Sequence, residues 1–359
     1  MRILLWYWGR RGGGAQYALG LARALARRGD VEASLALAEG LELLPEFRAT
    51  GLPLHLTRTY EDRLSFLAAL PRVPAARRAL AGAARGSDVV LSAMTHLWTP
   101  LVAPALAAAR LPFVPVVHDA APHPGDPAFA WGWRLGRELR AARAAVALSE
   151  EVAAALAARA PGLPVIRGRL PALLAEARPH VPSRGEVRFL FFGRLRAYKG
   201  LDLLRDAFAA LHARHPNTRL RVVGEGNAEG CAPGLAENPG VTVEARWVAE
   251  GEIPRLLAEA DAVVLPYREA SQSGVVPQAL AAGVPVVAMP VGGLREQVRE
   301  GGILATETTA AAFAEAMARL LNPGALEAAR AAAWRAGQAA TDWDAAAEEI
   351  VAGLRRVLP

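Results

Sequence analysis

The sequence has very little cysteine and very little lysine. Its one cysteine, Cys231, excludes an internal disulfide. The N-terminal residues show no charged-then-apolar segment ending in a secretory cleavage site, so we expect a cytoplasmic protein. Of the 41 basic residues, 40 are arginine and one, Lys199, is lysine. Because arginine serves at every other basic position, the lysine at 199 is a candidate functional residue.

Long uninterrupted apolar segments are also scarce. Residues 89–109 and 270–294 carry no charged side chain and are long enough to cross a membrane. Prolines interrupt both segments, and glycines interrupt the second. This pattern favours buried strands and helix starts over a transmembrane helix.

The length and composition are those of a folded protein with two domains. The chain has 359 residues, of which 53% are hydrophobic and 21% are charged. These values exclude a disordered chain and a single small binding module.

Positive charge is concentrated in the first half of the chain. Residues 1–175 contain 21 arginines and 13 acidic residues, whereas the remainder has a slight acidic excess. This asymmetry predicts an anionic partner for the first half, such as a nucleic acid, an acidic substrate or a lipid surface, although arginines that merely solvate helix faces would give the same count. No basic and aromatic recognition module is present, which argues against a nucleic-acid partner.

Short apolar runs alternate with helical patterns along the chain. In the first half the runs occupy residues 3–8, 89–92, 113–117 and 144–148, and a glycine loop and a helical pattern over 16–28 follow the first. In the second half they occupy residues 187–192, 219–223, 241–245, 262–265 and 284–288. Such alternation predicts parallel sheets that helices cover on both faces.

A proline-bearing stretch without helical period separates the two halves. We therefore predict an α/β protein with two Rossmann-like, doubly wound domains, at residues 1–170 and 187–340, joined by a linker at 171–186. A last helix is expected within 341–359, with apolar residues at helical spacing over 342–357 and Thr341 as its N-cap. In such sheets a ligand binds at the carboxyl ends of the strands, here in a cleft between two facing domains.

The clearest local motif opens the second domain. The apolar run 187–192 ends at Gly193, and two cations, Arg194 and Lys199, follow within one short loop before Gly200. A guanidinium and an ammonium at the carboxyl end of a strand suit a diphosphate, which offers several anionic oxygens. The alternative is a surface lysine without a function.

A second motif lies further along this domain. After the run 262–265 the chain continues through Glu269 into a polar loop, and a helix is expected to start near Gly274; the loop residues are Ser271, Gln272, Ser273 and Gly274. The free N–H groups and the positive end of such a helix would bind a phosphate. Gln278, one turn inside the helix, could bond to a ribose. An ordinary capped helix is the alternative.

Two glycine clusters give weaker signals. The pair Gly224 and Gly226 lacks the third glycine of the dinucleotide-binding fingerprint, so it predicts a turn after a strand. Gly12, Gly13 and Gly14 follow the first strand, where they would allow a ligand to approach the backbone closely.

Two imidazoles and two carboxylates follow the run 113–117. They are His118, Asp119, His123 and Asp126. Metal ligation is conceivable, but no HExxH motif or cysteine pair supports it, so no metal is predicted. Hydrogen bonding of His118 to a polar substrate is the preferred interpretation, and a structural histidine is the alternative.

Taken together, these motifs resemble the group 1 retaining glycosyltransferases of family GT4, which have the GT-B fold. The likeness covers nearly all of the second domain, where it includes the two loops above, the stretch from Gln278 to Val287, and Gly292, Gly293 and Glu296. In the first domain it rests on the opening strand with its glycine loop and on His118 and Asp119.

The resemblance implies a transferase that uses a nucleotide-diphosphate sugar as its donor and needs no cofactor. Arg194 and Lys199 match the cations that bind the diphosphate, and Ser273, Gly274 and Val275 match the amides that hold the phosphates. His118 matches a histidine placed near the donor sugar. The base would contact backbone atoms around Trp247 and Val248, and the last helix would return to the first domain.

The sequence departs from the family pattern at its pair of glutamates. An ungapped comparison places the pair at Ala270 and Gln278, so neither residue is glutamate. Glu269 lies one position before the first site and could serve in its place. A subset of the family has a similar Ser/Thr-Gln-Ser-Gly loop, and this chain is closest to that subset.

The expected reaction is metal-independent transfer of a sugar, with retention at the anomeric carbon, to a glycan or lipid-linked acceptor. The cations would stabilise the departing diphosphate, and domain closure would exclude water. The acceptor would bind the basic first domain, at an anionic membrane surface if it is lipid-linked. The alternatives are a nucleotide-sugar epimerase or a phosphorylase of the same architecture, and an inactive sugar-nucleotide-binding protein.

Overall fold

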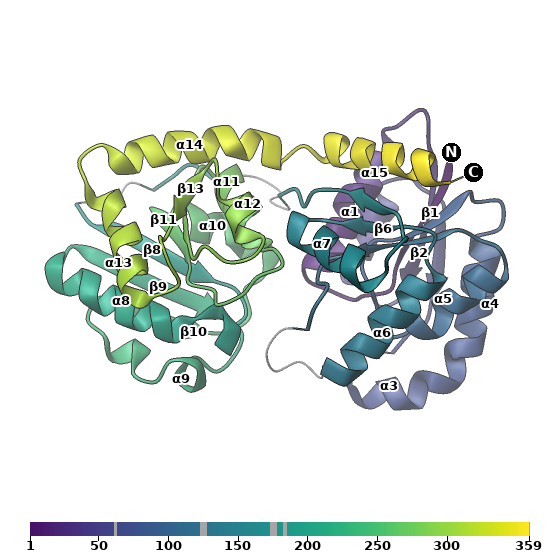
Figure 1. Cartoon of the computed structure of the whole chain (residues 1–359), viewed down its shortest axis with the longest axis horizontal. Helices are drawn as coiled ribbons and strands as arrows, with labels where there is room; N and C mark the ends of the chain where they lie inside the picture. Colours follow the sequence, from purple (N-terminus) through teal and green to yellow (C-terminus); the bar gives the residue numbers. More distant parts are fainter. Residues whose placement is uncertain (61–62, 123–127, 173–177, 182–184, 359) are drawn as a thin grey trace. The chain divides into compact units, whose positions relative to one another are not determined.

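In the computed structural model, the chain forms two compact units. The structure describes residues 1–60, 63–122, 128–172, 178–181 and 185–358. Unit 1 comprises residues 1–171 and 342–359, and unit 2 comprises residues 172–341. Figure 1 labels many of the helices and strands of both units.

Unit 1 is built on a seven-stranded parallel sheet with the order β3-β2-β1-β4-β5-β6-β7. The strands are β1 (Arg2–Tyr7), β2 (Glu32–Ala38), β3 (Leu54–Thr57), β4 (Val89–Ser92), β5 (Phe113–Val117), β6 (Ala145–Ala147) and β7 (Val165–Arg167). The helices are α1 (Gly13–Ala26), α2 (Leu44–Arg48), α3 (Arg63–Ala69), α4 (Val73–Ala83), α5 (Thr99–Ala108), α6 (Ala128–Ala141), α7 (Glu150–Arg159) and α15 (Trp343–Val357).

Successive side chains of β1 enter separate cores on the two faces of this sheet. Ile3 and Leu5 pack with apolar residues of α1 and α15. Leu4, Trp6 and Trp8 instead pack with residues of α4 and α5. This alternation is the two-residue period of a strand that is buried on both faces.

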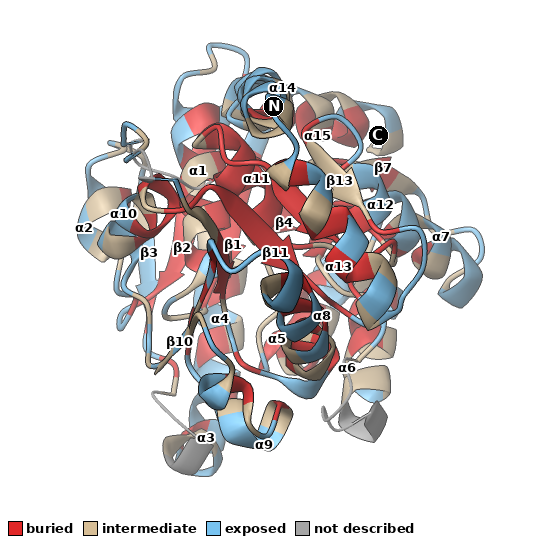
Figure 2. Cartoon of the chain, turned by 90° about the vertical axis from the view of Figure 1, so that its left-hand side faces the viewer, coloured by how far each residue is buried: buried red, intermediate tan, exposed pale blue. Residues whose placement is uncertain are grey.

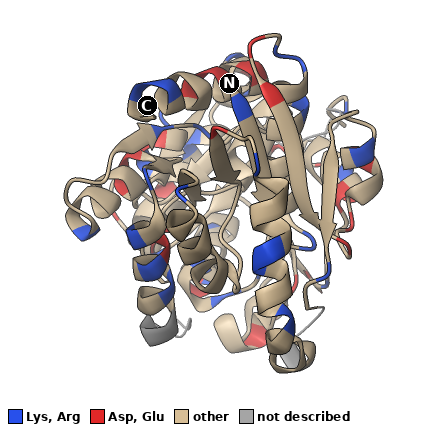
Figure 3. Ribbon diagram, turned by 90° about the vertical axis from the view of Figure 1, so that its right-hand side faces the viewer, with Lys and Arg blue, Asp and Glu red and all other residues tan. Residues whose placement is uncertain are grey.

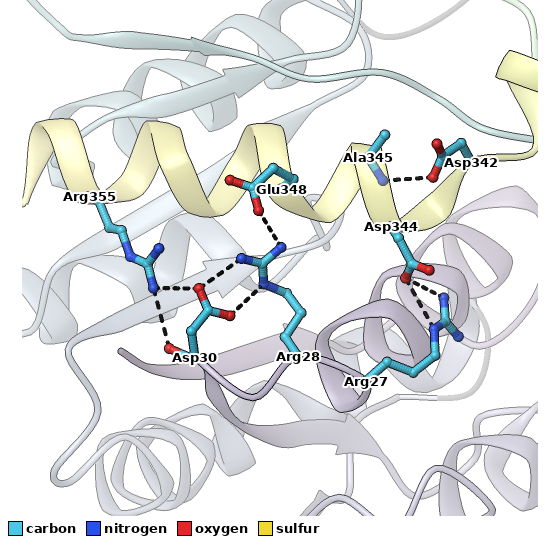
Figure 4. Close-up of polar contacts among 8 residues, drawn as sticks. All are labelled: Arg27, Arg28, Asp30, Asp342, Asp344, Ala345, Glu348 and Arg355. Atoms are coloured by element: carbon cyan, nitrogen blue, oxygen red, sulfur yellow. Dashed lines mark hydrogen bonds and ion pairs between the residues drawn. The ribbon is translucent and has the colours of Figure 1, made fainter.

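The last helix, α15, packs on α1 and is tied to unit 1 by ion pairs, as Figure 4 shows. Arg28 of the α1–β2 turn bonds to both Asp30 and Glu348, at 2.8 and 2.6 Å. Two further pairs join Arg27 to Asp344, at 2.6 Å, and Asp30 to Arg355, at 2.7 Å. Three arginines, two of the positively charged first half and one of the last helix, therefore have a structural role in these ion pairs.

Unit 2 has a six-stranded parallel sheet with the order β10-β9-β8-β11-β12-β13. The strands are β8 (Val187–Phe192), β9 (Thr218–Gly224), β10 (Val241–Ala245), β11 (Ala262–Leu265), β12 (Val286–Ala288) and β13 (Gly302–Leu304). The helices are α8 (Leu201–Arg214), α9 (Ala228–Cys231), α10 (Ile253–Ala258), α11 (Val275–Ala281), α12 (Leu294–Gln297), α13 (Ala310–Ala318) and α14 (Ala325–Ala340). Strand β11 is buried along its whole length (Figure 2).

The two parallel α/β sheets confirm the predicted fold class, and two local expectations need correction. The helical pattern was expected from residue 16, but α1 begins at Gly13, so Gly13 and Gly14 form its first turn rather than a loop. Thr341 was expected to cap the last helix, but the cap is Asp342, whose carboxylate accepts a hydrogen bond from the Ala345 N–H at 2.8 Å.

Candidate functional site

The two loops predicted to bind a diphosphate meet at one edge of the sheet of unit 2. Strands β8 and β11 are parallel neighbours, so the loops that follow them leave the same edge. Gly200 contacts the start of the second loop: a Cβ atom added to it would lie 2.0 Å from the Pro266 carbonyl oxygen. Its φ of +69° is also left-handed. Only glycine permits this approach at low cost, because backbone atoms cannot move aside as a side chain can.

Lys199 occupies the point where these loops meet. It ends a short 3₁₀ turn, Ala197–Lys199, and its Nζ lies 3.6 Å from the ring centroid of Tyr267, which follows β11. The Tyr267 ring is fully buried. A cation at this distance from an aromatic face is held in place by the ring quadrupole. Arg194, on the same loop, is exposed.

Arg268 fixes the segment around Glu269 to the Lys199 loop. The Arg268 N–H donates to the Tyr198 carbonyl at 2.8 Å, and the Arg268 guanidinium pairs with Asp202 of α8. Glu269 itself is exposed, and Ala270 is buried. The side chain at 269 is thus the acidic group that the second loop presents toward solvent.

The Ser/Gln loop is held by Gln297, a residue that the sequence analysis missed. The Ser273 N–H donates to Gln297 Oε1 at 2.8 Å, and Gln297 Nε2 donates to the Ser273 carbonyl at 3.1 Å. Ser273 Oγ accepts from the Val275 N–H at 3.3 Å. Two of the three amides that the resemblance assigns to phosphates therefore have protein partners in this structure, and Gly274 lies between them.

A glycine pair explains how α12 reaches this loop. A Cβ atom on Gly293 would lie 2.1 Å from the Ser271 carbonyl oxygen, and the Gly293 N–H donates to the Ala270 carbonyl at 2.9 Å. Gly292 and Gly293 are part of the family resemblance, which predicts no contact for them.

Gln278 lies where the sequence analysis placed it, one turn inside α11. Its side chain is 8% exposed, and among the described residues its Oε1 atom has no hydrogen-bond partner. A buried amide oxygen without a donor costs free energy, so a ligand hydroxyl that donates to it would be favoured. Ser271, Gln272 and Val275 are partly buried on the same loop and helix start.

Two other expected donor-binding positions, Trp247 and Val248, follow β10, and the glycines predicted to form a turn follow β9. Trp247 is 44% exposed and Val248 is partly buried. Arg246 donates to the Trp247 carbonyl at 3.2 Å. Close packing requires glycine at positions 224 and 226. A Cβ atom on Gly224 would lie 1.7 Å from the Gly193 carbonyl oxygen, and one on Gly226 would lie 2.4 Å from the Leu195 carbonyl oxygen. These glycines thus position the Arg194 loop.

In unit 1, the candidate residues gather beyond β4 and β5. The His118 ring packs edge-on against Tyr17 of α1, with 5.3 Å between centroids, and Tyr17 in turn contacts Trp343 of α15. Gly14 approaches Met94, which follows β4: an added Cβ would lie 2.4 Å from its sulfur. Gly13 is exposed at the helix start. His123 and Asp126 lie outside the described residues.

A cavity of about 130 Å³ opens beside His118. Its walls combine the ends of β4 and β5 with one face of α6; the lining residues are Met94, Thr95, Val117, His118, Asp119, Trp131, Arg134, Leu135 and Glu138. Burial lowers the pKa of His118, against an opposing effect of Asp119 and a hydrogen bond with the Ala93 backbone. The imidazole is therefore neutral at pH 7. Nowhere in the described parts of the chain do three or more potential metal ligands cluster.

Glu138 in this cavity was not foreseen from the sequence. Its side chain is 1% exposed, and burial raises its pKa to about 8, although the charge of Arg134 opposes that shift. The carboxyl group is therefore mostly protonated at neutral pH.

Comparison with known proteins decides the family. A family profile described as "Glycosyl transferases group 1" matches residues 186–323, and one described as "Glycosyltransferase Family 4" matches residues 11–167. Together the two matches take in most of the chain. The chain belongs to the group 1 glycosyltransferases, family GT4.

Relatives of this group 1 chain extend the comparison. A D-inositol 3-phosphate glycosyltransferase of Corynebacterium aurimucosum is 36% identical over 173 residues, which are 45% of this chain and 41% of that protein. The chain thus spans about two fifths of the length of the curated relatives it matches.

Solved structures show the same GT-B fold over the whole length. Sucrose-phosphate synthase of Thermosynechococcus elongatus superposes with a TM-score of 0.76 at 19% identity, covering 99% of this chain and 98% of that one. HepE of Anabaena, solved in complex with UDP and glucose, superposes with a TM-score of 0.72 at 19% identity, covering 99% of both chains.

Among the described helices of this GT4 chain, none has the length and apolar character needed to span a membrane.

Proposed function

We propose that this GT4 chain is a retaining, metal-independent glycosyltransferase that moves a sugar from a nucleotide-diphosphate sugar to a glycan or lipid-linked acceptor. The observation that carries the proposal is Lys199, the one lysine of the chain, fixed over Tyr267 where the loops after β8 and β11 meet. A compact ammonium at the carboxyl edge of a parallel sheet is suited to a diphosphate.

In the proposed reaction, Arg194 and Lys199 bind the diphosphate and stabilise its charge as the glycosidic bond breaks. Positive charge that is already in place lowers the barrier because the protein need not reorganise as the leaving group develops its charge. The two residues supply this charge without a metal ion. Gln278 accepts a hydrogen bond from a ribose hydroxyl, and Glu269 contacts the donor sugar.

Unit 1 is proposed to hold the acceptor. It contains 23 arginines against 17 acidic residues, whereas basic and acidic residues are equal in number in unit 2, so the net positive charge of the chain belongs to unit 1. This excess supports an acidic glycan, or a lipid-linked acceptor at an anionic membrane surface, as the partner. Figure 3 marks the basic and acidic positions along the ribbon.

The test is nucleotide binding by Lys199→Ala, measured by calorimetric titration with UDP, GDP and ADP. UDP is the first choice because HepE was solved with it. Loss of a charge-assisted contact should raise the dissociation constant about tenfold or more. Turnover with the matching nucleotide sugar should fall further, because the same charge stabilises the leaving group.

Arg214→Ala is the matched control. Arg214 pairs with Glu315 at the last turn of α8, so its removal should leave nucleotide binding unchanged. Equal affinity of Lys199→Ala and the parent chain would refute the proposed site. Binding of a nucleotide sugar without transfer or slow hydrolysis would indicate an inactive binding protein, and interconversion of donor sugars would indicate an epimerase.

A further inference from the structure

The cavity in unit 1 contains polar groups that the proposed transfer does not use. Glu138 is almost completely buried, and neither of its carboxyl oxygens has a hydrogen-bond partner among the described residues. The Nε atom of Arg134, one turn earlier on α6, is buried and likewise has no partner within the described chain. Burying such groups without partners is costly, so packing of α6 does not explain them.

The size of the cavity limits what it can hold. Its volume of about 130 Å³ is far above the 10–15 Å³ that a single water requires. It is also below the roughly 300–1,000 Å³ of pockets that enclose drug-sized ligands. The space therefore fits one ring of a larger molecule rather than the whole of it.

The chemistry of the walls selects the kind of ring. Arg134 donates hydrogen bonds and Asp119 accepts them, and their opposite charges offset each other. The His118 imidazole, which is hydrogen-bonded to the Ala93 backbone, can accept at its Nε2, and a protonated carboxyl at 138 can both donate and accept. Trp131 adds an indole to the wall. Such a mixture matches hydroxyl groups, which also donate and accept, better than it matches an anion.

We propose that Glu138, with Arg134, binds the hydroxyl groups of an uncharged pyranose or cyclitol ring of the acceptor and determines specificity for it. The inference rests on the proposed function, since it names the class of acceptor that unit 1 would take. Glu138 lies on α6 and the ring would occupy the cavity beside His118, so the residue is a specificity determinant rather than a catalytic residue.

The experiment measures binding of single rings to the full chain by saturation-transfer NMR and titration. The neutral probes are methyl glucoside, methyl galactoside, methyl mannoside and myo-inositol, and the anionic probes are glucose 6-phosphate and inositol 1-phosphate. At least one neutral probe should bind. Glu138→Met, of similar volume but apolar, should weaken that binding about tenfold, and Glu138→Gln, which still donates and accepts, should retain most of it.

Two controls separate the possible results. Glu46→Met removes another carboxyl with a buried, unpartnered oxygen, on α2 and outside the cavity, and should leave ring binding unchanged. UDP titration of every variant reports on unit 2 independently. Undiminished ring binding by Glu138→Met, preference for the phosphorylated probes, or UDP binding without any ring binding would each overturn the inference. Absence of nucleotide binding with intact ring binding would instead overturn the proposed function alone.

Discussion

The Gln278 side chain favours ligand binding but lowers the stability of the ligand-free protein. Its amide oxygen is buried without a partner in the described structure, so folding loses a hydrogen bond to water that nothing replaces. Gln278→Met should therefore unfold at an equal or higher denaturant concentration than the parent chain. The same substitution should remove the preference for a nucleoside diphosphate over its 2′-deoxy or 3′-deoxy form, which we expect to be about fivefold or more.

The control for this prediction is Gln338→Met on α14, where the side chain is exposed. It should change neither the stability nor the ribose preference. If Gln278→Met kept the full discrimination between the ribose and deoxyribose forms, the contact between Gln278 and the ribose would be ruled out.

At the scale of single residues, the sequence allowed prediction of local motifs but not of contacts between distant segments. Lys199 stood out by composition alone, and the loops around it could be located from glycines after apolar runs. Gln297 and Glu138 could not be found in this way. On α6 the carboxyl at 138 has Arg134, Arg137 and Arg140 as neighbours, which resembles a solvated face, and only the tertiary fold buries it.

At the scale of elements, buried central strands were predicted well and short edge strands were missed. The ranges of β4, β5, β8 and β11 agree with the apolar runs, and so does that of the five-residue edge strand β10. Strands β3, β7 and β13 have three or four residues each and lie at sheet edges, where so short a run gives little periodicity. Strand β2 was missed for another reason: its sequence, EASLALA, is rich in residues that favour a helix.

The contact between α1 and α15 supports a prediction at this scale. A Cβ atom on Gly20 would lie 2.4 Å from the Trp343 ring, which also contacts Tyr17 beside His118. Gly20→Ala should therefore destabilise unit 1, because overpacking costs about 1–3 kcal/mol and outweighs the roughly 1 kcal/mol gained in helix propensity. Denaturant unfolding monitored by far-ultraviolet circular dichroism measures the change.

Gly82→Ala is the matched control for Gly20→Ala. Gly82 lies in α4, is exposed, and an added Cβ would meet no atom within 4 Å. This variant should be neutral or slightly more stable, by less than about 1 kcal/mol. Equal stabilisation by both substitutions would show that α15 does not pack tightly on α1.

At the scale of the whole molecule, the net positive charge belongs to unit 1, which includes the last helix, rather than to the first half of the sequence. The last helix belongs to unit 1 and carries four acidic residues, Asp342 among them as the cap, which reduces the positive excess counted over residues 1–175. The sequence alone could not show this, because the pairing of Arg28 with Glu348 joins positions 320 residues apart.

Glu138 makes the stability of the whole chain depend on pH in a direction opposite to that of an ordinary carboxylate. Its pKa is raised from 4.5 to about 8 in the fold, so the native state binds more protons than the unfolded state between these values. The free energy of unfolding should then fall as pH rises from about 4.5 to 8, by at most about 1.4 kcal/mol per pH unit, and level off above 8. Arg134, on the same helix, and His118 and Asp119, after β5, line the same cavity as this carboxyl.

Comparison with Glu138→Gln isolates this contribution, because the amide does not titrate while the other groups of both chains do. The stability difference between the parent chain and Glu138→Gln, from denaturant unfolding at pH 5, 6, 7 and 8, should shift steadily against the parent chain as pH rises. Two units need not unfold together, so the transition of unit 1 must be followed separately. A difference that stays constant would mean that the Glu138 carboxyl ionises at an ordinary pH and that its surroundings are wetter than the structure indicates.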